Sequence, residues 1–232
     1  MAEQKDLEPP DRSKGDVAHA VVRAGIAAVP LVGGSGVEIF TALVSPPLEK
    51  RRNEWMEQVG EALRDVAEAH ELDLEALRED DAFLDSVLHA TQVALRNSAS
   101  EKRKALRNAV LNVALDRGPD DALREMFIAW IDEMTVWHLR ILDLFRNPPG
   151  WFEAQGRDFP EVYQGALSTV LVEAYPVLQD RKSFYDQVWE ELRSRGLVNT
   201  NSLHALMSQM GISAGRVTPL GEAFLKFIQE PD

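Results

Sequence analysis

Residues 48–67 read LEKRRNEWMEQVGEALRDVA, and this stretch decides the fold class. Its apolar side chains recur every three or four residues, a spacing that places them on one face of an α-helix. They are Leu48, Trp55, Met56, Val59, Leu63, Val66 and Ala67. Charged residues lie opposite. The stretch therefore predicts a long amphipathic helix with one side buried against the rest of the protein.

The same spacing returns along the chain as far as residue 145. Apolar sets occupy residues 83–95, 105–113, 123–131 and 137–145. Gly118-Pro119 separates two of these helices, and Thr135 is expected to cap the last of them. No stretch shows the alternating pattern of a strand for more than about five positions. We therefore expect an all-α fold, an irregular multi-helix bundle.

The bundle is expected to cover residues 48–182, with a break near 147–151. That break is indicated by the turn-forming sequence Asn-Pro-Pro-Gly at 147–150. A further helix is expected to begin at Asp158, because Glu161 follows it with the spacing of a capping box. Tyr175-Pro176 should end this helix.

The N-terminal part of the chain is different in character. Residues 1–15 are polar and predict a disordered lead, whereas residues 16–47 are apolar and rich in glycine. We expect a hairpin of two short helices there, broken at Pro30 and residues 33–36 and ended by Pro46-Pro47. Its longest uncharged run is 14 residues, 24–37. This is short of the roughly 18 residues that a membrane-spanning helix needs.

Residues 183–232 predict a small C-terminal module. Ser183 can cap a helix, and Gly196 suits the left-handed position after its end. Two short extended pairs, 197–198 and 216–217, flank an expected helix over 202–210. Thr218 should cap the final helix, with Pro219 at its first position.

This arrangement resembles the wing region of winged-helix proteins. In that fold a helix ends in Gly, a strand follows, and a Thr-x-x-Gly segment, here Thr218 to Gly221, starts the closing helix. The resemblance implies either DNA binding or protein docking. Residues 180–232 hold six Lys or Arg and seven acidic residues, a net charge of 6 − 7 = −1. Because DNA binding needs clustered positive charge, protein docking is the better expectation.

Composition excludes several kinds of function. The chain has 232 residues and 25 Lys+Arg against 38 Asp+Glu, a net charge of −13 that disfavours nucleic acid as a partner. It has no cysteine, which excludes disulfides, cysteine zinc sites and thiol nucleophiles. We expect a cytoplasmic protein.

No motif predicts catalysis, a cofactor or a metal. The glycines at 33–36 are not followed by the Lys-Ser/Thr pair of a phosphate-binding loop. Asp85 and His89 have the spacing of two metal ligands, and Glu133 with His138 could complete such a site. We interpret them instead as a surface carboxylate beside a partly buried histidine, and expect a non-enzymatic protein.

Three functions remain open. The first is docking of a protein partner through the C-terminal module or a bundle face, with Trp151, Phe152, Arg195 and Arg216 as candidate partner-binding residues. The second is a membrane-associating protein, or a toxin-like or defence effector, whose Gly-rich apolar hairpin at residues 16–47 inserts into lipid. Its candidate contacts are Ile26, Val29, Leu31, Ile39, Phe40, Lys50, Arg51 and Arg52. The third is DNA-binding regulation. A homo-oligomer would also cover the apolar hairpin.

Overall fold

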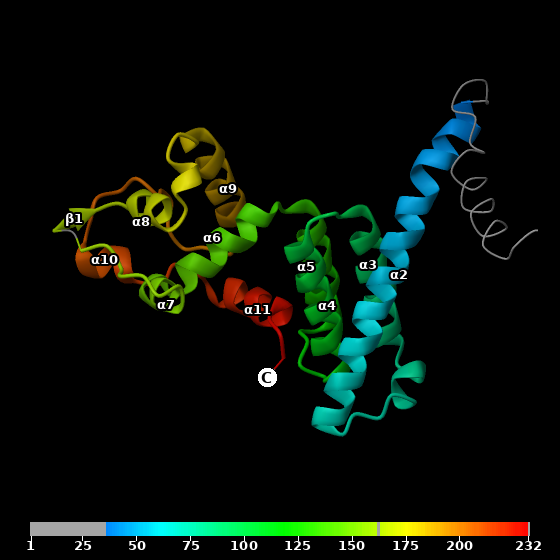
Figure 1. Cartoon of the computed structure of the whole chain (residues 1–232). Coiled ribbons are helices and arrows are strands. Elements are labelled where there is room, and N and C mark those ends of the chain that lie inside the picture. The colour runs from blue at the N-terminus through cyan, green and yellow to red at the C-terminus, as the bar shows by residue number, and fades with distance from the viewer. Residues whose placement is uncertain (1–35, 162, 232) are drawn as a thin grey trace, which may run out of the picture. The chain divides into compact units, whose positions relative to one another are not determined.

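The computed structural model describes residues 36–161 and 163–231 (Figure 1). The described chain is mostly helical, as expected for an all-α protein, with one two-stranded sheet. In chain order the elements are α2 Gly36–His70, η1 Ala76–Glu79, α3 Asp81–Arg96, α4 Ser100–Ala114, α5 Asp121–Glu133, α6 Val136–Arg146, α7 Pro148–Ala154, β1 Gln164–Gly165, α8 Leu167–Ala174, η2 Pro176–Leu178, α9 Lys182–Ser194, β2 Met207–Ser208, α10 Gln209–Ser213 and α11 Pro219–Ile228.

The chain divides into two compact units, Met1–Arg52 and Asn53–Asp232. The expected lead at 1–15, and the part of the expected hairpin before residue 36, lie outside the described residues. None of the helices that the structure describes has the length and apolar character needed to cross a membrane. The C-terminal segment 183–232 belongs to the same compact unit as the bundle.

Helix α2 corrects one expectation. Pro46 and Pro47 were expected to end a short helix, but α2 runs through both of them without interruption. A proline removes one N–H donor and crowds the carbonyl four residues earlier, which favours a bend more than an end. Residues 48–52, Leu-Glu-Lys-Arg-Arg, are all strong helix formers that carry the helix onward. The stripe that follows is buried at Trp55 and Val59.

Helices α3, α4 and α5 pack against one another (Figure 1). Their starts are fixed by side-chain caps, because Asp80 accepts the N–H of Phe83 and Asp120 accepts the N–H of Leu123. Helix α4 is the central one, since nearly every residue from Ala105 to Ala114 is buried. Pro119 lies before the α5 cap and not at the first helical position.

Between α6 and α9, the helix boundaries expected at the two proline-containing turns are confirmed. One expected helix does not form. Asn147 ends α6 and caps α7, and Tyr175 ends α8. The helix expected from Asp158 does not form, and α8 begins only at Leu167. Phe159 packs edge-on against Phe152 with ring centroids 5.5 Å apart, so a tertiary contact overrides the local capping signal.

The C-terminal segment matches some expected features and corrects others. Gly196 has φ +73°, Val198 forms an antiparallel bridge with Val217, and Thr218 caps α11 by accepting the N–H of Gly221. Ser183 is not a cap, since α9 already begins at Lys182. Residues 202–210 are not one helix, because the segment pairs as β2 with β1, at Gly165 opposite Met207 and Gln164 opposite Ser208.

Helix α11 returns to the bundle and is held by α4. The amide of Asn112 donates to the carbonyls of Phe227 at 3.0 Å and Gln229 at 2.9 Å, and Asn108 donates to Ile228 at 3.0 Å. These carbonyls belong to the last turn of α11, where no helical N–H remains to satisfy them. Two buried asparagines therefore act as the C-terminal cap of a helix more than 100 residues away.

We predict that Asn112→Ala lowers the free energy of unfolding by about 1–3 kcal/mol, because buried carbonyls lose their donor. Urea denaturation followed by circular dichroism measures the change. The exposed Asn201 provides the matched control, and Asn201→Ala should leave the midpoint unchanged. Equal midpoints for Asn112→Ala and wild type would contradict the capping role.

Two glycines should respond in opposite directions to alanine. A Cβ at Gly221 would lie 2.4 Å from the Leu197 carbonyl oxygen, so Gly221→Ala should cost about 1–3 kcal/mol of stability. Gly60, inside α2, has nothing within 4 Å of its Cβ position. Gly60→Ala should therefore stabilise by about 0.5–1 kcal/mol. Thermal unfolding of both variants tests the pair, and a tolerated Gly221→Ala would show that α11 is not tightly docked at its start.

Candidate functional site

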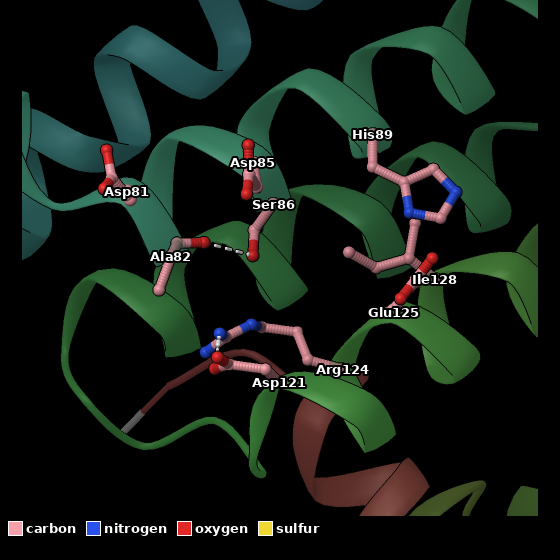
Figure 2. A pocket seen from close by; sticks show the side chains of 9 residues that line it. All are labelled: Asp81, Ala82, Asp85, Ser86, His89, Asp121, Arg124, Glu125 and Ile128. Carbon is pink, nitrogen blue, oxygen red and sulfur yellow. Dashed lines mark hydrogen bonds and ion pairs between the residues drawn. The ribbon is translucent and has the colours of Figure 1, made fainter.

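A groove of about 600 Å³ lies between α3 and α5, and most of its charged lining residues are acidic (Figure 2). It is lined by Asp81, Ala82, Asp85, Ser86, His89, Asp121, Arg124, Glu125 and Ile128. The lining holds four carboxylates and one guanidinium, a net charge of 1 − 4 = −3 when His89 is counted as neutral. The groove therefore favours a positively charged ligand.

The two helices build the groove from the same local pattern. Residues 80–85 read DDAFLD and residues 120–125 read DDALRE, so each helix has a capping Asp followed by acidic residues at its first and fifth positions. Acidic residues in a first turn are stabilised by the positive end of the helix dipole. Positions four apart share a helix face, which places Asp81 with Asp85 and Asp121 with Glu125.

Only some of the charged and polar residues that line the groove are paired with other side chains or carbonyls of the protein. Arg124 forms an ion pair with Asp121, and Figure 2 shows its guanidinium turned toward that carboxylate. The Ser86 hydroxyl is buried and donates to the Ala82 carbonyl at 2.7 Å, so it is not presented as a nucleophile. In the described part of the chain no hydrogen bond or ion pair involves the side chains of Asp81, Asp85 or Glu125.

The metal site considered from the sequence does not assemble. Asp85 and His89 line the groove, but Glu133 is paired with Arg195 at 2.8 Å and His138 with Glu191 at 2.9 Å. Within residues 36–161 and 163–231, no group of three or more His, Asp or Glu side chains could hold a metal ion.

The candidate partner-binding residues are engaged inside the fold. Phe152 is fully buried, and Trp151 packs against it and against Tyr175. Arg195 pairs with Glu133 and lies over the Trp130 ring. Arg216 donates to the Gly211 carbonyl and contacts the Met207 sulfur at 3.3 Å. All four residues make contacts within the fold, and Trp151, Arg195 and Arg216 remain partly exposed. Their role in binding a partner stays a prediction.

The candidate membrane residues fall mostly outside the description. Ile26, Val29 and Leu31 precede the described residues, and the side chains of Ile39 and Phe40 are not described. Lys50, Arg51 and Arg52 lie on α2, where Lys50 and Arg52 are exposed. Membrane association through residues 16–47 stays a prediction.

His138 is the most deeply buried titratable side chain with a defined hydrogen-bond network. Its side chain is 3% exposed, Nδ1 accepts the backbone N–H of Thr135 at 3.0 Å, and Nε2 lies 2.9 Å from Glu191. The neutral ring with its proton on Nε2 satisfies both contacts. Burial lowers the pKa of His138 below its ordinary 6.5, with Arg195 also lowering it and Glu191 opposing the change.

This shift predicts a pH dependence of stability. Below pH 6.5 the unfolded chain binds a proton at His138 that the folded chain resists, so the free energy of unfolding falls as the pH drops through this window. In His138→Gln the amide oxygen can still accept the Thr135 N–H, as in a capping box, but cannot titrate. Urea midpoints between about pH 7.5 and 5.5 should therefore fall less in this variant than in wild type.

The exposed His70 supplies the control, and His70→Gln should keep the wild-type dependence. An equal fall in midpoint for His138→Gln and wild type would contradict the role of His138.

Comparisons of the chain with protein-family models, with curated proteins and with solved structures found no match in any of the three.

Proposed function

We propose that this protein binds a cationic segment of a partner protein in the α3–α5 groove and acts as a non-enzymatic docking protein. One observation carries the proposal: Asp81, Asp85 and Glu125 share a cavity, with no internal ion pair among the described residues. Neighbouring carboxylates repel one another, and a bound cation relieves that repulsion. A Lys or Arg side chain entering the groove would gain this energy.

The shape and charge of the groove favour a protein segment over other ligands. A volume of about 600 Å³ accommodates several side chains, and its length follows two helices. Nucleic acid is disfavoured, because its phosphates would meet four carboxylates. A partner with spaced Lys or Arg side chains matches acidic residues that recur every four positions.

The winged-helix-like segment 183–232 is proposed as a second docking element of the same protein. Support comes from the Gly196 turn, the Val198–Val217 bridge and the Thr218 cap. Residues 183–232 hold four Lys or Arg and six acidic residues, a net charge of 4 − 6 = −2 that favours a protein over DNA as their partner.

Reversing charge in the groove should weaken binding of a cationic probe. The probe is a fluorescent nine-residue oligo-arginine peptide, with affinity measured by anisotropy. Asp85→Lys/Glu125→Lys should weaken it by about tenfold or more, equal to about 1.4 kcal/mol. Affinity for wild type should fall between about 50 and 500 mM salt, because screening shortens the reach of charge interactions.

The control carries the same change in net charge at another surface. Glu153→Lys/Asp158→Lys alters two exposed acidic residues outside the groove and should change the affinity by less than about twofold. Circular dichroism verifies that both variants fold. Equal weakening by the two variants would show a general effect of net charge, and the proposal would fail.

A further inference from the structure

The outer face of α3 carries apolar and acidic residues in one stripe. Asp81, Leu84, Asp85, Leu88 and His89 are spaced three, one, three and one residues apart, which places all five on the same side of the helix. Leu84 is 44% exposed and Leu88 is 59% exposed. An isolated exposed leucine needs no explanation, but two on successive turns beside unpaired carboxylates form a mixed surface.

The orientation of α3 about its own axis is fixed by the residues on its buried side. Phe83, Ser86, Ala90, Val93 and Ala94 are the buried residues of this helix. They fill the side opposite the stripe, so Leu84 and Leu88 cannot turn inward without exposing Phe83 and Ala90. The leucines are therefore held at the surface by the packing of α3 against α4 and α5.

Leucines and carboxylates lie on two flanks of the exposed face. Asp81, Asp85 and His89 also line the groove toward α5, whereas Leu84 and Leu88 do not. A ligand that covers both flanks must present cations along one edge and apolar side chains along the other. An amphipathic helix with Lys or Arg beside its apolar stripe has this pattern, with anchors at positions i, i+3, i+4 and i+7.

We infer that the partner segment is a basic amphipathic helix that lies along α3, with its apolar side on Leu84 and Leu88 and its cations toward Asp85 and Glu125. This inference rests on the proposed function and specifies the conformation of the partner. The stripe from Asp81 to His89 extends about 12 Å along α3, so a helix of three turns covers it. The acidic groove favours a cationic partner, and the two exposed leucines favour a partner segment that is an amphipathic helix.

The test uses two 16-residue peptides of identical Lys and Leu composition. In one peptide the leucines recur at helical spacing, and in the other they are dispersed around the helix. Isothermal titration should give an affinity for the amphipathic isomer at least about fivefold above that for the dispersed one, about 1 kcal/mol. Leu84→Ser/Leu88→Ser should abolish this preference and leave the binding of oligo-arginine unchanged.

Leu74→Ser is the matched control, because Leu74 is similarly exposed and lies outside α3. It should preserve the preference for the amphipathic isomer. If Leu84→Ser/Leu88→Ser keeps the preference, or if wild type binds both isomers equally, the helical partner is overturned while charge-driven docking stands. If no cationic peptide binds wild type, the proposed function fails and the inference fails with it.

Self-association is a separate outcome. Sedimentation of the protein alone should give the same mass for wild type and for Leu84→Ser/Leu88→Ser. A wild-type dimer that becomes a monomer in this variant would assign the stripe to a second copy of the chain and overturn the inference.

Discussion

The amide of Asn112 is the contact on which the arrangement of the helices depends. It satisfies carbonyls at the end of α11 and so fixes that helix against α4. The start of α11 is fixed where Gly221 meets the Leu197 carbonyl, just after α9. With both ends held, α11 presents Phe224 and Phe227 to Phe127 of α5, with ring centroids 5.3 and 5.9 Å apart. These ring contacts add to the packing of α5 against α3 and α4, which places one wall of the groove.

Helices with strong apolar periodicity could be predicted from the sequence, whereas segments fixed by tertiary contacts could not. The apolar residues within 83–95 and 123–131 predicted α3 and α5 correctly, because each of these helices buries one face. Residues 202–210 carry a helical pattern, yet the Leu203 carbonyl accepts the N–H of Ser168 and Met207 pairs with Gly165. Backbone partners about 40 residues away are absent from any local pattern. The same holds for Asn112, which has no sequence signature of a cap.

The acidic groove could be predicted only in part, since the spacing of Asp85 and His89 shows that they share a helix face but not that α5 adds further carboxylates. Basic residues are plausible partner contacts in a sequence, but several of them are paired inside this fold. Arg195 pairs with Glu133 at the end of α5, Arg216 donates to the Gly211 carbonyl, and Arg146 pairs with Glu222. The buried Lys102 donates to the Asp132 carbonyl at 2.7 Å. Burial lowers the pKa of Lys102, although nearby Asp132 opposes the change. Because these basic side chains are paired within the fold, the acidic side chains that outnumber them remain exposed at the surface. The repeated Asp-Asp-Ala at 80–82 and 120–122 was the available signal for the groove.

The four carboxylates of the groove are not equivalent. Asp81 and Asp121 occupy first turns, where the positive end of the helix dipole stabilises them, and Asp121 also holds Arg124. A cation placed there would face two helix N-termini and a guanidinium. Asp85 and Glu125 lie one turn further along, beyond the range over which the dipole acts strongly. An incoming cation therefore gains most beside Asp85 and Glu125, and this position is next to Leu88, which makes the charged and apolar contacts of the α3 face available to one ligand at once.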